Sequence, residues 1–321
     1  MLSRSLVSKA LSSLVALLAL GGCISLPQTE GLRASGYAGL PARTELVDVP
    51  YYPQEDFMCG PTSLAMALNG VGVDATVSTL TEQVYLPGRE GSLQVEMLAA
   101  TRRNGALAYQ LVPELRAVLQ EVAAGTPVVA LLNLSGTKIL PLWHYAVVVG
   151  YDLEREEIIV RTGPNPRRVT ALGFFEFLWM DGGYWAMVAV PPNRVPATAQ
   201  EQPYAAAAAA LELARRREAG VAYRALLSRW PENLIGLVGL GNVEHAEGNL
   251  TAAEAAFRRA VTAHPQSAVA LNNLAQTLAD LGRLEEAETA ARTAVALGGA
   301  TLPAAQSTLA QIVEKRSRAR P

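Results

Sequence analysis

Hydrophobic and polar residues follow three successive patterns along the chain. An apolar run over residues 10–20 comes directly after two basic residues near the N-terminus. Between about residues 45 and 192, helical periodicities come first and extended apolar runs come later. From residue 205 onward the chain is rich in alanine and keeps a helical period. These patterns predict a targeting segment, a mixed domain and a helical domain.

The middle pattern predicts an α+β domain over residues 45–192, because helices that precede a set of antiparallel strands form this class of fold. We expect helices over residues 61–68, 93–103 and 113–122, and extended segments over residues 45–51, 128–134, 144–151, 158–161 and 184–190. A proline-rich stretch over residues 193–203 is expected to be the linker to the helical part.

Residues 204–318 repeat with a period of 34. Alanines and prolines recur at this interval, namely Ala219, Ala253, Ala287, Pro231 and Pro265. The period and the small residues resemble tetratricopeptide repeats, in which helix pairs cross closely and stack into a solenoid. We expect a degenerate repeat over residues 206–232, two regular repeats and a capping helix over residues 303–315. A generic alanine-rich bundle would not repeat so regularly.

The composition narrows the possible functions. Half of the 321 residues are hydrophobic, 17% are charged, and the formal net charge is −2. An intrinsically disordered chain would have far fewer apolar residues, and a nucleic-acid-binding domain would carry a basic surface. We therefore expect folded domains and no nucleic-acid partner.

The N-terminal segment resembles the signal of a bacterial lipoprotein. The apolar run is too short to span a membrane and has the length of a signal-peptide core. It ends at Leu20-Gly21-Gly22-Cys23, which resembles a lipobox. We expect a signal peptide over residues 1–22, lipidation of Cys23, and a tether over residues 23–44. Ile24 favours the outer membrane, with the protein facing the periplasm; an ordinary signal peptide that contains a cysteine is the alternative.

Cys59 is the only other cysteine in the chain. If Cys23 carries lipid, Cys59 cannot form an internal disulfide, although the compartment is oxidising. Gly60 and Pro61 follow it at the start of a predicted helix. The helix dipole there favours a thiolate, and the first backbone N–H groups are free to hold an oxyanion. The sequence therefore predicts a nucleophile.

A nucleophilic cysteine needs a base, and the chain has three histidines. His245 and His264 lie in the helical part, where neither has a companion at metal-ligand spacing, so we expect no metal site. His144 begins a predicted strand and is the remaining candidate.

Residues 54–62, Gln-Glu-Asp-Phe-Met-Cys-Gly-Pro-Thr, and residues 144–152, His-Tyr-Ala-Val-Val-Val-Gly-Tyr-Asp, resemble the papain-like peptidases that process double-glycine leaders of bacteriocins. The resemblance implies a papain-like cysteine peptidase fold over residues 45–192, with no cofactor. It implies that Cys59 is the nucleophile, His144 the base and Gln54 a side-chain donor to the oxyanion.

The chain departs from that family at the residue that orients the histidine. The family has an Asp-Pro pair at the end of the next strand, where this chain has Arg-Thr-Gly-Pro-Asn over residues 161–165. Asp152 cannot replace it, because eight residues of strand place it roughly 26 Å from His144.

Three groups remain candidates for orienting His144. A hairpin turn over residues 153–156 places Asn165 opposite His144, whereas a turn nearer the strand start places Thr162 there. A backbone carbonyl is the third candidate. We expect Asn165, because its side-chain oxygen can accept the imidazole N–H.

Together these features predict a lipid-anchored cysteine peptidase of the bacterial cell envelope. Its substrate would be a peptide or protein, and its repeats would recruit the substrate or a protein partner in a concave groove. The missing aspartate favours an alternative, a weak or inactive peptidase fold that scaffolds an envelope complex. An amidase or transpeptidase that uses the same cysteine and histidine is a third possibility.

Overall fold

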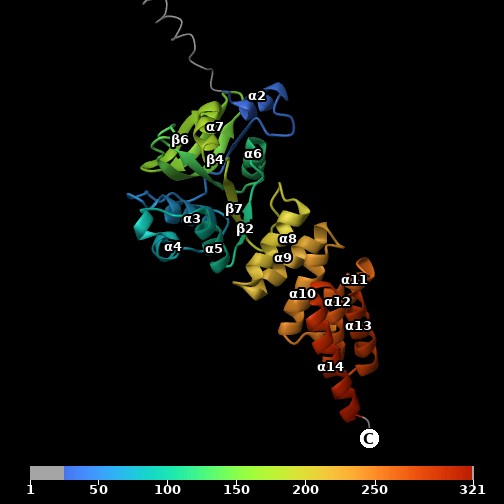
Figure 1. Cartoon of the computed structure of the whole chain (residues 1–321). Helices are drawn as coiled ribbons and strands as arrows, with labels where there is room; N and C mark the ends of the chain where they lie inside the picture. The colour runs from blue at the N-terminus through green and yellow to red at the C-terminus, as the bar shows by residue number, and fades with distance from the viewer. Residues whose placement is uncertain (1–24, 320–321) are drawn as a thin grey trace, which may run out of the picture.

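The structure, a computed structural model, describes residues 25–319. The expected signal peptide (1–22) and lipidation site Cys23 lie outside the described residues. An α+β domain occupies one end of the described chain, and helices α8 to α14 extend from it (Figure 1). None of the helices within residues 25–319 is long and apolar enough to span a membrane.

A seven-stranded antiparallel sheet forms the centre of the α+β domain. Its strands are β1 (Arg43–Glu45), β2 (Leu107–Gln110), β3 (Val128–Asn133), β4 (Trp143–Asp152), β5 (Glu157–Thr162), β6 (Asn165–Ala171) and β7 (Ala186–Val190). The order is β2-β7-β3-β4-β5-β6, with β1 paired to the distal end of β4. All of β3 is buried, which explains why its sequence is an uninterrupted apolar run rather than an alternating one.

Helices cover both faces of the sheet. Val129 and Leu131 of β3 pack in a core beneath α3 (Cys59–Asn69), α4 (Val77–Val84) and α5 (Gln94–Arg103). The alternate residues Val128 and Leu132 pack on the other face, beneath α6 (Leu115–Ala123) and α7 (Leu172–Met180). Short 3₁₀ turns lie at Pro87–Arg89 and Gly299–Thr301. The three predicted helices are present as α3, α5 and α6.

Residues 25–43 do not form the expected tether. They contain α2 (Pro27–Ala34), in which Thr29 and Leu32 are buried. The residue before α2 provides no side-chain cap. Instead, the carboxylate of Glu176 on α7 accepts the N–H groups of Gln28 (3.0 Å) and Thr29 (2.7 Å). A cap supplied from a distant element leaves no local signal, so the sequence did not predict this helix.

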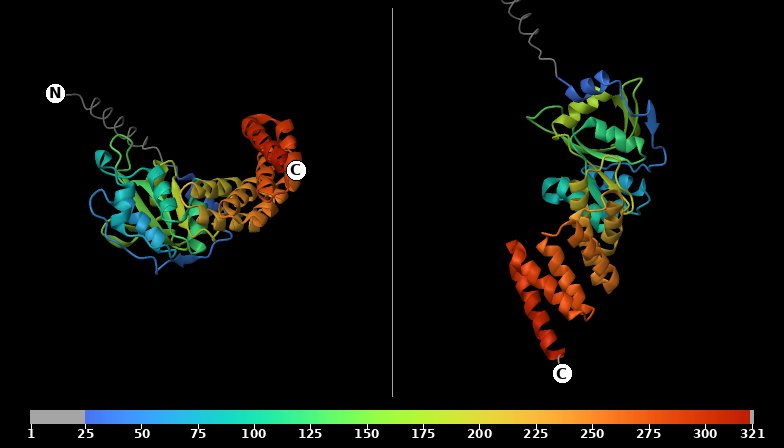
Figure 2. Two further views of the ribbon diagram at one scale, coloured as in Figure 1. Left: turned by 90° about the horizontal axis from the view of Figure 1, so that it is seen from below. Right: turned by 90° about the vertical axis from the view of Figure 1, so that its right-hand side faces the viewer.

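The helical part consists of three helix pairs and a final helix. The pairs are α8 (Glu201–Glu212) with α9 (Arg216–Arg229), α10 (Leu234–Ala246) with α11 (Leu250–Ala263), and α12 (Ala268–Asp280) with α13 (Leu284–Leu297); α14 (Leu302–Ala319) follows. Gly241 shows why small residues recur, since a Cβ there would lie 2.5 Å from the ring of Phe257. The helices form a curved arm (Figure 2).

The expected linker is fixed to the α+β domain. The buried carboxylate of Glu121 on α6 accepts the Thr198 N–H (2.7 Å), the Thr198 hydroxyl (2.6 Å) and, at 3.3 Å, the Ala197 N–H. Tyr204 and Ala208 of α8 then join the same apolar core as the sheet. The first helix pair is therefore packed into the α+β domain rather than separated from it.

Candidate active site

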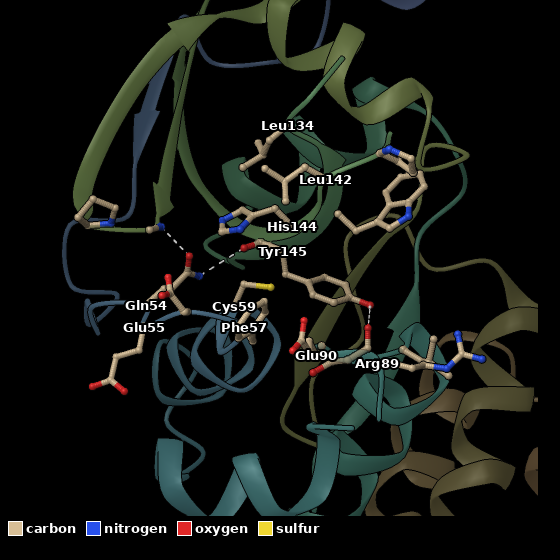
Figure 3. Close-up of a pocket in the computed structure, with 18 residues that line it drawn as sticks. Gln54, Glu55, Phe57, Cys59, Arg89, Glu90, Leu134, Leu142, His144 and Tyr145 are labelled. Carbon is tan, nitrogen blue, oxygen red and sulfur yellow. Dashed lines mark hydrogen bonds between the residues drawn. The ribbon is translucent and has the colours of Figure 1, made fainter. Parts of the chain in front are cut away.

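A cleft of about 690 Å³ lies where α3 and β4 begin. Cys59, His144 and Gln54 line it, so the tertiary structure brings three of the four predicted catalytic residues together (Figure 3). Asn165 is not among the lining residues.

Cys59 is the first residue of α3, at a helix terminus that no side chain caps. The backbone N–H groups of Cys59 and Gly60 are therefore directed out of the helix end beside the sulfur. Gly60 is needed for a close approach, because a Cβ there would lie 2.3 Å from the Ser92 hydroxyl oxygen. Position 60 therefore requires glycine because the Ser92 side chain, in the loop before α5, packs against it.

The thiol of Cys59 is neutral in the resting site. Burial raises the pKa of Cys59, and hydrogen bonding to the backbone of Tyr145 and Gly60 opposes this rise without cancelling it. This shift opposes the thiolate that the helix dipole is expected to favour. The helix terminus does favour the anion, but the loss of hydration in the buried site has the larger effect.

His144 is held by a hydroxyl rather than by an amide or carboxylate. Its Nε2 lies 2.7 Å from Oγ1 of the buried Thr162. Burial, together with the positive charge of Arg168, lowers the pKa of His144 to about 4, so the ring is neutral at pH 7. If Nε2–H donates to Thr162, the Nδ1 lone pair is free to accept a proton. Within residues 25–319, no hydrogen bond joins the Cys59 thiol to this ring.

The placement of Asn165 opposite His144 is wrong. The hairpin turn does follow Asp152, but a bulge near Val149 shifts the register between β4 and β5 by one residue. The chain then turns at Gly163 and Pro164, and Asn165 begins β6, where it pairs with Thr162 of β5. Asn165 therefore lies on the side of β5 that is away from β4. The Gly163-Pro164 pair was the available sequence signal for this turn, and the alternative Thr162 is the residue that contacts His144.

The Gln54 amide joins three segments of the site. Its Oε1 accepts the Gly163 N–H at 2.5 Å, and this donor fixes which end of the amide is oxygen. Its Nε2 lies 3.0 Å from the Ser63 hydroxyl and 3.3 Å from the Tyr145 carbonyl oxygen, which are themselves 3.0 Å apart. The amide is thus held between the Gly163 backbone and the backbone of β4.

Ser63 is a site residue that sequence reasoning missed. It lies in α3, one turn after Cys59, and is fully buried. Its hydroxyl donates to the Tyr145 carbonyl and so connects α3 to the strand that carries His144. The available signal was a hydroxyl residue inside an otherwise apolar helix, because a buried polar group requires a partner.

The other two histidines have structural partners. His245 lies 2.9 Å from the carboxylate of Asp280, and His264 lies 2.6 Å from the carbonyl oxygen of Glu232. Within the described part of the chain, no cluster of three His, Cys, Asp or Glu residues could hold a metal ion.

Family models match both parts of the chain. Residues 46–171 match the Peptidase_C39 like family. Residues 204–268 and 244–312 match two tetratricopeptide repeat models. A comparison with curated protein sequences found no match. The predicted fold class, an α+β domain of C39-like peptidase type followed by tetratricopeptide repeats, is confirmed.

Solved structures are similar to each part separately. A C39-like peptidase from Bacillus anthracis is 19% identical, with coverage of 47% of this chain and 98% of that one and a TM-score of 0.39. The type III secretion translocator chaperone SycD of Yersinia enterocolitica is 21% identical, with coverage of 39% and 90% and a TM-score of 0.35.

Proposed function

Because the chain joins a C39-like peptidase domain to tetratricopeptide repeats, we propose that it is a cysteine peptidase that hydrolyses peptide bonds in the cleft. Cys59 is the nucleophile and His144 the proton carrier. The observation that carries the proposal is the pairing of Cys59, at an uncapped helix terminus, with a histidine whose Nε2 is held by Thr162. Since thiol and ring are both neutral at rest, the proton moves during attack.

The first step forms a thioester. The Cys59 thiol gives its proton to Nδ1 of His144 as the sulfur attacks the scissile carbonyl carbon. Negative charge develops on the carbonyl oxygen, where the N–H groups of Cys59 and Gly60 and the side-chain amide of Gln54 can donate to it. The imidazolium then protonates the leaving amine. In the second step water attacks the thioester, His144 accepts the water proton, and the sulfur leaves with a proton returned from the ring.

Variants of the nucleophile test the proposal. We expect Cys59→Ala to reduce hydrolysis of a fluorogenic peptide library to background, because no other described thiol lines the cleft. A chloromethyl ketone peptide should label Cys59 in the native protein, as located by mass spectrometry. Leu213→Ala, at an exposed position on the helical arm, is the matched control and should keep full activity. Undiminished hydrolysis in Cys59→Ala would reject the assignment.

Lipid anchoring and partner recruitment complete the proposal. The lipobox-like sequence supports attachment through Cys23 to the bacterial outer membrane, with the protein facing the periplasm.

Tetratricopeptide repeats are protein-interaction modules. A concave site on this arm is lined by side-chain amides of Asn242, Asn272, Asn273 and Gln276. These groups suit a protein substrate or partner, because amides pair with peptide backbone.

The electrostatics of His144 favour a second candidate function. Burial and the like charge of Arg168 lower its pKa to about 4, and both effects disfavour an imidazolium. A fold with such a site could serve as a non-catalytic scaffold in an envelope complex. The alkylation rate of Cys59 separates the two functions. If bound peptide accelerates alkylation, the peptidase is supported. If peptide leaves the rate unchanged and no hydrolysis is detected, the scaffold is supported.

A further inference from the structure

The loop between β3 and β4 and the first residue of β4 expose four large apolar side chains beside the cleft. Ile139 is 86% exposed, Leu140 78%, Leu142 60% and Trp143 48%. Leu142 and Trp143 also line the cleft mouth. A contiguous exposed apolar surface of this kind marks an interaction site.

The loop is ordered, so the exposure is not a result of a flexible excursion. The buried Asn133 donates to the Thr137 carbonyl (2.9 Å), and its Oδ1 accepts the Ser135 hydroxyl (2.8 Å) and the Leu142 N–H (2.9 Å). The Leu134 N–H closes the loop by donating to the Leu142 carbonyl (2.8 Å). These bonds hold the base of the loop, from which Ile139 and Leu140 project into solvent.

Helix α7 extends the apolar surface. Gly136 of the loop packs on Phe177, since a Cβ there would lie 2.8 Å from its ring. The neighbouring ring of Phe174 is 45% exposed and lies 6.3 Å, between centroids, from that of Phe177. We call the five residues Ile139, Leu140, Leu142, Trp143 and Phe174 the apolar rim.

The start of the described chain lies on the same helix. Leu26 packs on Gly173, where a Cβ would lie 2.9 Å from the leucine side chain. The Glu176 carboxylate holds the first turn of α2 through Gln28 and Thr29. Cys23 precedes Leu26 by three residues, a length of chain that reaches about 10 Å at most. A lipid on Cys23 would therefore enter the membrane close to α7.

We propose that the apolar rim docks into the lipid bilayer to which Cys23 is anchored, so that the cleft opens at the membrane surface. This proposal rests on the lipid anchor of the proposed function. Trp143 has the amphipathic side chain found at membrane interfaces. The side chain of Lys138 is 86% exposed, and its ammonium lies 3.7 Å from the Asp181 carboxylate, so a lipid phosphate would share this cation with Asp181. The repeats extend from the other end of the domain (Figure 1). The peptidase would thus act on polypeptide at the membrane surface, while the arm reaches away from it.

Quenching of tryptophan fluorescence tests the proposal. Trp143 is the most exposed of the four tryptophans, since Trp179 and Trp185 are buried. The purified full-length protein is reconstituted in phosphatidylethanolamine–phosphatidylglycerol vesicles with bromine on the upper acyl chain. We expect the bromine to quench the fluorescence of the native protein. Relative to the native protein, quenching should fall at least twofold in the Ile139→Glu/Leu140→Glu variant and in the uncharged Ile139→Ser/Leu140→Ser variant. The matched control Leu213→Glu, at a leucine that is 92% exposed on the arm, should be quenched like the native protein.

Three results would overturn the docking proposal. The first is an absence of quenching of the native protein in vesicles. The second is equal quenching of the rim variants and the control. The third is a dimer in detergent that the rim substitutions dissociate, which would assign the rim to a second copy. Failure of the lipid anchor is seen separately. Mass spectrometry of Cys23 and membrane fractionation of the Cys23→Ser variant test whether the lipid anchor exists. Sedimentation of the Cys23→Ser variant with vesicles measures membrane binding by the apolar rim without the anchor.

Discussion

Thr162 shows how a single residue can change the character of a thiol–imidazole site. A carboxylate behind the ring would favour the imidazolium, whereas a hydroxyl fixes the ring orientation without adding charge. Burial, together with the positive charge of Arg168, lowers the pKa of His144, and the Thr162 hydroxyl adds no negative charge to oppose this. The site is thus better suited to proton transfer during attack than to a standing ion pair.

The hydroxyl of Thr162 should matter for turnover rather than for binding. We expect Thr162→Val to lower kcat about five- to tenfold, the worth of one hydrogen bond, with little change in KM. Thr162→Ser keeps the hydroxyl and should restore most of the rate. Asn165→Ala is the matched control, because Asn165 is exposed on β6. Steady-state kinetics with one peptide substrate decide this, and a larger loss in Asn165→Ala than in Thr162→Val would contradict it.

Burial of His144 also predicts how stability depends on pH. The ring takes up a proton near pH 6.5 in the unfolded chain and near pH 4 in the folded protein. The unfolded state therefore binds more protons between these values, so stability falls as the pH drops from 6.5 to 4, by about 3 kcal/mol from this residue. Above pH 6.5 the residue contributes no pH dependence.

Urea unfolding at pH 7 and pH 4 measures this effect. His144→Gln should lose less free energy of unfolding than the native protein over that interval. The difference between the two proteins gives the contribution of the His144 ring alone. Carboxylates such as Glu45, whose pKa is lowered by a hydrogen bond from Arg167, contribute equally to both proteins. Identical losses in the two proteins would show that His144 is hydrated.

At the scale of elements, the contact between the α3 terminus and the loop before α5 positions the nucleophile. Gly60 lets Ser92 approach the first turn of α3, and Met97 lies just beyond. The Tyr145 hydroxyl donates to the Ser92 carbonyl at 3.3 Å, which attaches the same loop to β4. Helix, loop and strand therefore fix one another around Cys59.

This contact predicts a rescue. Gly60→Ala should destabilise the protein by about 1–3 kcal/mol, the usual cost of overpacking, because its Cβ would lie 2.6 Å from the Ser92 Cβ. Ser92→Gly removes both clashing atoms, so the double variant should recover most of the loss. A double-mutant cycle from urea unfolding measures the coupling. Additive effects would mean that the loop moves freely.

At the scale of the whole molecule, the domain boundary is a continuous core. Tyr109 of β2 accepts the Gln200 N–H at 3.0 Å, and α8 packs against β2. The repeats beyond α10 have apolar clusters of their own. The arm is therefore rigidly based on the α+β domain at its first helix pair.

Glu121 should control this junction. Glu121→Ala leaves the N–H of Thr198 without its acceptor, and we expect a loss of about 2 kcal/mol and faster proteolysis within residues 191–200. Glu114→Ala, an exposed residue just before α6 with no capping bond, is the control. Limited trypsin digestion with mass spectrometry locates the cuts. Equal cleavage rates in both variants would show that the carboxylate does not hold the linker.

Local sequence was enough to predict the α+β class, the 34-residue repeat and the choice of Cys59 and His144 as candidate site residues. These follow from local periodicity, from short motifs and from the scarcity of cysteine and histidine. Helix ends were predicted closely where the pattern was strong, as in α3 and α5.

The partner of His144, the burial of the Cys59 thiol and the position of α2 depend on contacts between distant segments. A one-residue bulge in β4 and the turn at Gly163 replaced Asn165 with Thr162. Burial outweighed the helix dipole at Cys59, and Glu176 capped a helix whose own sequence has no cap. Register, desolvation and distant caps depend on which segments meet in space, and local sequence does not specify those meetings.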